Sequence, residues 1–62
     1  MMKYYHMTVK RDGVRFTVFT LTSSIAHFLA IEKELGRRTF VEYSREIDRE
    51  EYEFAIDHGL ND

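Results

Sequence analysis

The sequence predicts an α+β fold of order ββαβα, in which a three-stranded sheet packs against one main helix and a short C-terminal helix. Two observations support this prediction. Residues 3–21 alternate apolar and polar side chains on both sides of an Asp-Gly pair, which is typical of a β-hairpin. Residues 22–36 begin with hydroxyl side chains, continue with apolar residues at helical spacing and end at a glycine, which is typical of one complete helix.

Length and composition indicate a single domain over residues 1–62. The chain is 44% hydrophobic and 32% charged, so it resembles a globular protein and not a disordered one. A chain of 62 residues is near the lower limit at which a hydrophobic core alone keeps a domain folded. It has no cysteine, and therefore neither a disulfide nor a cysteine zinc site. We therefore expect a homodimer, or a complex with a partner, to add stability.

The sequence also bears on where the protein acts. No apolar run is long enough to cross a bilayer. Residues 1–10, MMKYYHMTVK, lack the apolar core of a signal peptide. We therefore expect a cytoplasmic protein without membrane association.

The Asp12-Gly13 pair sets the register of the predicted hairpin. A type I′ turn requires positive φ at both central positions, and this dipeptide suits it. The turn pairs Arg11 with Val14, and a slip of one residue would move every side chain to the other face. One face of the hairpin then carries Tyr5, Met7, Val9, Phe16 and Val18, and we expect this face to contribute to the core.

The opposite face of the hairpin is basic near the turn and aromatic near the open end. Lys10 and Arg15 lie near the turn, and Tyr4, Phe19 and Leu21 lie near the open end. A solvated face has no need of such an apolar cluster, so the C-terminal helix or a second subunit must cover it. We expect self-association through Tyr4, Phe19, Leu21 and Phe40.

The main helix is predicted to start after Thr22 or Ser23 as the N-cap and to end with Gly36 at the C′ position. Its core stripe is expected to contain Ile25, Phe28, Leu29, Ile31 and Leu35. Glu32 falls inside this apolar arc, where an unpartnered carboxylate is costly. We favour a position near the helix end from which Glu32 reaches water. The alternative is that it meets an arginine or a tyrosine hydroxyl, from this subunit or another.

Residues 38–45, RTFVEYSR, are predicted to form the third strand. Strict alternation places Thr39, Val41 and Tyr43 on one side, with Arg38, Phe40, Glu42 and Ser44 on the other. The connection through the main helix is long enough for a parallel βαβ unit, which leaves a mixed sheet open.

The second helix is predicted to run from about Arg49 to His58 and to stop at Gly59. Asp48 as the N-cap and Glu51 three residues later resemble a capping box, and Ile47 and Tyr52 have the spacing of a hydrophobic staple. Phe54 projects to the far side of this helix, where we expect it to take part in a contact.

Charge divides the chain into a basic and an acidic part. Residues 1–38 carry seven basic and three acidic side chains, giving +4, and residues 39–62 carry two basic and eight acidic ones, giving −6. The two parts can attract each other within one fold. Alternatively, the basic part binds an anion or the acidic part binds a basic partner.

No catalytic, cofactor or metal motif is present. His6, His27 and His58 are too far apart in sequence to form a helical ligand pair, and no HExxH pattern occurs. Gly13, Gly36 and Gly59 are explained by a turn and two helix ends, so there is no phosphate-binding loop. We therefore predict a non-enzymatic protein without cofactors.

Two binding functions remain. We favour a small regulatory or inhibitory protein that binds another protein, a class that phages and other mobile elements often encode. This class rests on how small stand-alone proteins are commonly used and not on one residue. The predicted protein-binding residues are Phe54, Glu50, Glu53, Glu42 and Glu46. The alternative is a nucleic-acid-binding module that uses Lys10, Arg11, Arg15, Arg37 and Arg38.

Overall fold

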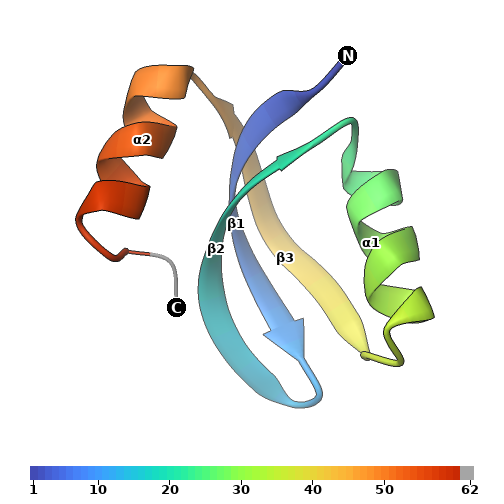
Figure 1. Ribbon diagram of the computed structural model, residues 1–62. Helices are drawn as coiled ribbons and strands as arrows, with labels where there is room; N and C mark the ends of the chain where they lie inside the picture. Colours follow the sequence, from blue (N-terminus) through green and yellow to red (C-terminus); the bar gives the residue numbers. More distant parts are fainter. Residues whose placement is uncertain (61–62) are drawn as a thin grey trace.

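The computed structural model describes residues 1–60 and has the expected element order ββαβα. Its elements are β1 (Lys3–Arg11), β2 (Val14–Thr22), α1 (Ile25–Glu34), β3 (Thr39–Ile47) and α2 (Arg49–Asp57). The three strands form one sheet, and the two helices lie on opposite sides of it (Figure 1). No helix within residues 1–60 is long and apolar enough to cross a membrane.

The hairpin of β1 and β2 has the predicted turn and register. Asp12 and Gly13 have φ values of 51° and 87°, as a type I′ turn requires. Arg11 pairs with Val14, and the same register continues to the far end of both strands. Met7, on the face predicted to form the core, is fully buried. The local turn chemistry therefore determines which side chains of both strands reach the interior.

The strand order is β2-β1-β3, and both pairings are antiparallel. The connection through α1 is a crossover, for which the sequence showed that it was long enough, and β3 runs in the same direction as β2. The connection passes over β1, however, so β3 pairs with the free edge of β1 and not with β2. A parallel pairing, which the sequence left open, does not form between the described strands.

β3 contains a bulge that the sequence pattern did not reveal. The register shifts between Thr8 and Val9, whose partners are Tyr43 and Val41. Glu42 is therefore an extra residue with no partner in the β1 ladder. A bulge of one residue reverses the facing of every side chain that follows it in the strand.

The prediction that Tyr43 shares a side with Thr39 and Val41 is therefore wrong. Beyond the bulge, the Tyr43 ring lies edge-on to His6, with 5.9 Å between ring centroids, on the face that α2 covers in part. Ser44 instead pairs opposite Met7 and faces the α1 side. The strand also extends to Ile47, two residues beyond the predicted end.

α1 begins later than predicted. Thr22 is the last residue of β2, and the N-cap is Ser24, whose hydroxyl accepts a hydrogen bond from the His27 backbone N–H at 3.0 Å. The predicted end is confirmed, because Gly36 has a φ of 76° and its N–H bonds to the Lys33 carbonyl. The Arg37 N–H bonds to the Glu32 carbonyl, and these two hydrogen bonds form a Schellman motif.

The buried face of α1 also differs from the prediction. Ile25, Phe28 and Leu29 are partly buried, and Glu32 is the one buried residue of the helix. Ile31 and Leu35, which were expected in the core stripe, are exposed. The inward positions thus follow the i, i+3, i+4, i+7 spacing of one helix face, with a carboxylate at the last position.

α2 covers the aromatic end of the other sheet face. Phe19, Ile47 and Ala55 form a buried cluster there, and Tyr4 and Tyr52 pack against it. The centroids of the two tyrosine rings are 4.8 Å apart. An element of the same chain therefore covers the apolar end of the hairpin, as one of the two sequence hypotheses required.

The ends of α2 match the prediction closely. The Asp48 side chain accepts a hydrogen bond from the Glu51 N–H at 2.8 Å, as an N-cap should. The Glu51 carboxylate, however, binds Arg45 instead of closing a capping box. His58 is the C-cap and Gly59, with a φ of 65°, is the C′ residue.

Candidate functional site

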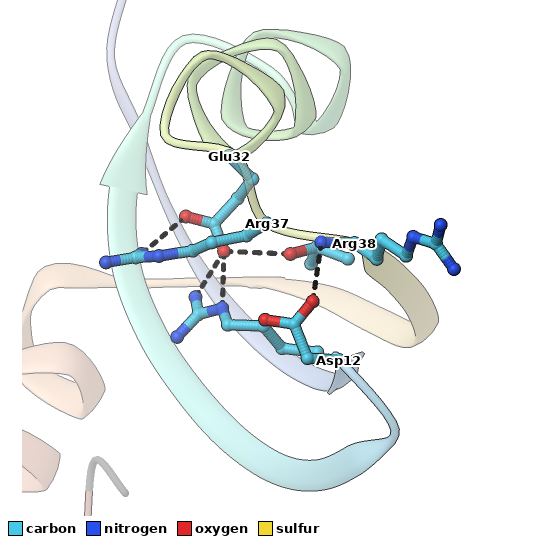
Figure 2. A network of polar contacts seen from close by, with 6 residues as sticks. Asp12, Glu32, Arg37 and Arg38 are labelled. Carbon is cyan, nitrogen blue, oxygen red and sulfur yellow. Dashed lines mark hydrogen bonds and ion pairs between the residues drawn. The ribbon is translucent and has the colours of Figure 1, made fainter.

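The most extensive polar network in the structure surrounds Glu32, at the end of α1 (Figure 2). This side chain is buried, with 4% of its surface exposed. Its Oε1 accepts hydrogen bonds from Arg11 Nε at 2.6 Å and from Thr39 Oγ1 at 3.0 Å. Its Oε2 accepts one from Arg37 Nη1 at 2.9 Å. The prediction that Glu32 reaches water is wrong, and the alternative that it meets an arginine is right within a single chain.

The helix end itself positions part of this network. Gly36 turns the chain so that the Arg37 N–H donates to the Glu32 carbonyl at 3.0 Å. The Schellman turn therefore brings the Arg37 side chain back over the Glu32 side chain. Arg11 and Thr39 come from paired positions of β1 and β3. One carboxylate thus links α1 to two strands.

The protonation of Glu32 follows from these contacts. Burial opposes its negative charge, but hydrogen bonds from Thr39, Arg11 and Arg37 outweigh burial and hold its pKa below the usual range of a glutamate. A carboxylate that is fully hydrogen-bonded and difficult to protonate is a poor general acid or base. We therefore expect Glu32 to contribute to the stability of the fold.

Internal ion pairs engage most of the residues predicted to bind nucleic acid. Arg11 and Arg37 bind Glu32. Arg15 donates two hydrogen bonds to Glu42, at 2.6 Å and 3.1 Å, and these bonds lower the pKa of Glu42. Lys10 and Arg38 are the members of this set with no carboxylate ion pair within residues 1–60. The basic surface is therefore much smaller than the sequence suggested.

A hollow of about 580 Å³ lies beside the hairpin turn. It is lined by Lys10, Asp12, Gly13, Arg38 and Phe40. The Asp12 backbone N–H donates to the Arg38 carbonyl at 2.9 Å, and the Arg38 N–H donates to Asp12 Oδ1 at 3.1 Å. These bonds attach the turn to the start of β3. Sequence reasoning missed the hollow, because the pairing of β1 with β3 is not visible in the local pattern.

The outer face of α2 unites three of the five predicted protein-binding residues, Glu50, Glu53 and Phe54. Phe54 is 57% exposed and stacks on His58, with ring centroids 4.0 Å apart and 23° between the planes. Nδ1 of His58 donates to the Phe54 carbonyl at 2.8 Å. Glu53 pairs with Arg49 at 3.2 Å. Phe54 is therefore exposed, and its ring stacks on the imidazole of His58.

The other two predicted residues lie elsewhere. Glu42 is the bulge residue of β3 and pairs with Arg15. Glu46 lies opposite Tyr5 on the face that α1 covers, and it is 3.7 Å from Lys3. The acidic part of the chain is thus divided among three places, and α2 carries the acidic surface next to an exposed aromatic ring.

The residues predicted to self-associate are divided as well. Phe19 is buried beneath α2, and Tyr4 packs against the same cluster. Leu21 and Phe40 remain exposed, at opposite ends of the sheet. The aromatic cluster expected at a subunit interface therefore belongs largely to the core of one subunit.

The three histidines lie on different elements of the fold. His6 stacks on Phe19 with 4.7 Å between ring centroids, and His27 is exposed on α1. Within residues 1–60 no group of three His, Asp or Glu side chains is arranged to hold a metal ion.

Comparison with protein-family models, curated proteins and solved structures found no match to this chain.

Proposed function

We propose that this protein is a small, non-enzymatic regulatory or inhibitory protein that binds another protein through the outer face of α2. The observation that supports the proposal is the arrangement of Phe54, which is 57% exposed yet held by its stack on His58. Aromatic side chains that are fixed before binding lose little conformational entropy in a complex, and they are frequent energetic centres of protein interfaces.

The charges around Phe54 determine the chemistry of the partner. Glu50, Glu53 and Asp57 are exposed on the same helix. Glu50 has no ion pair within residues 1–60, and the exposed pair of Glu53 with Arg49 contributes little stability. A partner can therefore bind these carboxylates with little loss of the stability of the fold. We expect a basic protein surface with an apolar recess that accepts the Phe54 ring.

The inner face of α2 makes this surface stable enough for recognition. Ala55 and Tyr52 attach the helix to the aromatic core, so the outer residues are presented on a fixed element. Binding of a helix face in a groove is a common mode of peptide and protein recognition. We also propose that the protein acts inside the cell, as the sequence predicts.

Photo-crosslinking tests this proposal in cells. A photoreactive amino acid is placed at position 54 and, in a matched control, at position 40, which also carries an exposed phenylalanine. We expect a defined protein adduct from position 54 and not from position 40. The partner is then purified and titrated with Phe54→Ala and Phe40→Ala. The expected result is a Kd at least about tenfold higher for Phe54→Ala alone. Equal Kd values for both variants would contradict the proposal.

A further inference from the structure

Arg38 differs from the other five arginines of the chain. Arg11 and Arg37 bind Glu32, Arg15 binds Glu42, Arg45 binds Glu51 and Arg49 binds Glu53. The Arg38 guanidinium has no carboxylate partner within residues 1–60, and Figure 2 shows it pointing away from the Glu32 network. In a chain whose net charge is −2, an arginine without an acidic partner is available for an anionic ligand.

The backbone around Arg38 is fixed. Its N–H and carbonyl both bond to Asp12, at 3.1 Å and 2.9 Å. Lys10 pairs with Phe40 across the sheet, and Arg38 precedes Phe40 by two positions. Because Lys10 and Phe40 are paired residues of neighbouring strands, they lie on the same face of the sheet, and Arg38 lies just before the start of β3. All three line the hollow beside the turn.

The hollow combines two cations with an exposed aromatic ring. Phe40 is 68% exposed, which leaves much of its ring available for stacking. An arginine guanidinium binds phosphate oxygens in a forked geometry, and lysine adds a point charge. A ring beside such cations is the combination that binds a base together with its phosphate. The volume of about 580 Å³ also falls within the range of small-ligand sites.

We infer that this hollow binds one nucleotide unit, with its phosphate between Lys10 and Arg38 and its base stacked on Phe40. The unit is a free nucleotide or part of a single strand, because both present the same base and phosphate. A base within a duplex is stacked on its neighbours and cannot use Phe40 in this way.

Two features of the surroundings limit the ligand. Asp12 lines the hollow, and its Oδ1 accepts a hydrogen bond from the Arg38 N–H. The second carboxylate oxygen of Asp12 repels further phosphates, and it can accept a hydrogen bond from an amino group of a base. The exposed acidic residues of α2 repel a long polyanion. The site therefore suits one or two nucleotides, with weak and salt-sensitive affinity.

The experiment uses fluorescence anisotropy of a labelled eight-nucleotide single strand of mixed sequence, as DNA and as RNA, with the intact protein. We expect binding at low salt that is lost at high salt, and a Kd at least tenfold higher for Arg38→Ala and for Phe40→Ala. The controls remove the same groups elsewhere: Arg49→Ala removes an equal charge on α2, and Phe54→Ala removes an equal ring. Circular dichroism verifies that each variant is folded.

The outcomes of this experiment either identify the kind of ligand or overturn the inference. Displacement of the strand by adenosine or guanosine monophosphate assigns a free nucleotide to the site, and binding of the strand without displacement assigns a strand. The same measurement is made with a duplex of the same sequence. No binding of the single strand, equal binding of the duplex, equal losses for Arg38→Ala and Arg49→Ala, or equal losses for Phe40→Ala and Phe54→Ala would overturn the inference. Phe54→Ala is only a ring control here, and binding of the partner protein is not measured, so this site and the proposed function stand or fail separately.

Discussion

The two helices are attached to opposite faces of one sheet by different interactions. The one buried residue of α1 is the carboxylate of Glu32, which is held by two arginines and a threonine. The one buried residue of α2 is Ala55, which packs into an aromatic cluster. Apolar packing tolerates changes of pH and salt, whereas an ion network depends on protonation. We therefore expect α2 to remain attached under conditions that release α1.

The largest effect is expected from the cluster beneath α2. Phe19→Ala removes a buried ring and leaves a cavity, so the free energy of unfolding should fall by about 3 kcal/mol. Urea unfolding followed by circular dichroism measures the loss. Leu21→Ala, at an exposed position of the same strand, is the control and should cost less than about 1 kcal/mol. Similar losses for both variants would show that the cluster is not the core of this face.

The next effect is expected from the network of α1. Glu32→Gln leaves Arg11 and Arg37 without a compensating charge, so the free energy of unfolding should fall by about 2 kcal/mol. This loss is smaller than that for a fully buried ion pair, because Arg37 is partly exposed. Glu34→Gln removes an exposed carboxylate of the same helix and should change the free energy of unfolding by no more than about 0.5 kcal/mol. If the two variants unfold at the same urea concentration, the network does not attach α1.

The pH dependence separates the two helices directly. Because the pKa of Glu32 is lowered in the folded state, its contribution is complete above the pKa of an unfolded glutamate, about 4.3, and is lost as pH falls through the folded value. The urea midpoints of the wild type and Glu32→Gln should therefore differ above about pH 4.3 and converge as the pH falls below this value. The loss caused by Phe19→Ala should persist there. A constant gap for Glu32→Gln at all pH values would contradict the lowered pKa.

A smaller effect should distinguish the two helix ends. Gly36 and Gly59 have φ values of 76° and 65°, and an added Cβ meets no atom within 4 Å at either position. Alanine should therefore cost about 1 kcal/mol at each site through backbone strain alone. Gly36→Ala should cost somewhat more, because the same turn places Arg37 on Glu32. Thermal unfolding of both variants tests this, and a greater loss for Gly59→Ala would argue against that coupling.

Local signals in the sequence predicted the local structure well. Asp12-Gly13 determines the hairpin register, and Asp48 and Gly59 mark the ends of α2. Each of these features depends on backbone geometry within a few residues of the signal, so the sequence contains it directly. The N-cap of α1 was predicted at Thr22 or Ser23 and lies at Ser24, because all three residues carry hydroxyl groups. The pairing of Thr22 with Lys3 extends β2 and moves the start of the helix to later residues.

Features that depend on distant residues could not be predicted in this way. The bulge at Glu42 exists because β3 pairs with β1, and it alone reverses the side on which Tyr43 lies. Glu32 meets Arg11 across 21 positions of sequence, so periodicity marks it as anomalous without naming its partner. The hollow at the turn likewise needs Lys10 and Phe40 to be neighbours, which only the sheet order provides.

The central functional claim is that α2, fixed on its aromatic core, presents a recognition surface to a basic protein. The most direct test is titration of the crosslinked partner with the double variant Glu50→Lys, Glu53→Lys, at low and high salt. We predict a Kd at least about tenfold higher and a much weaker salt dependence, while the charge-reversal control Glu34→Lys binds like the wild type. Equal affinity of the double variant and the control at low salt would contradict the claim.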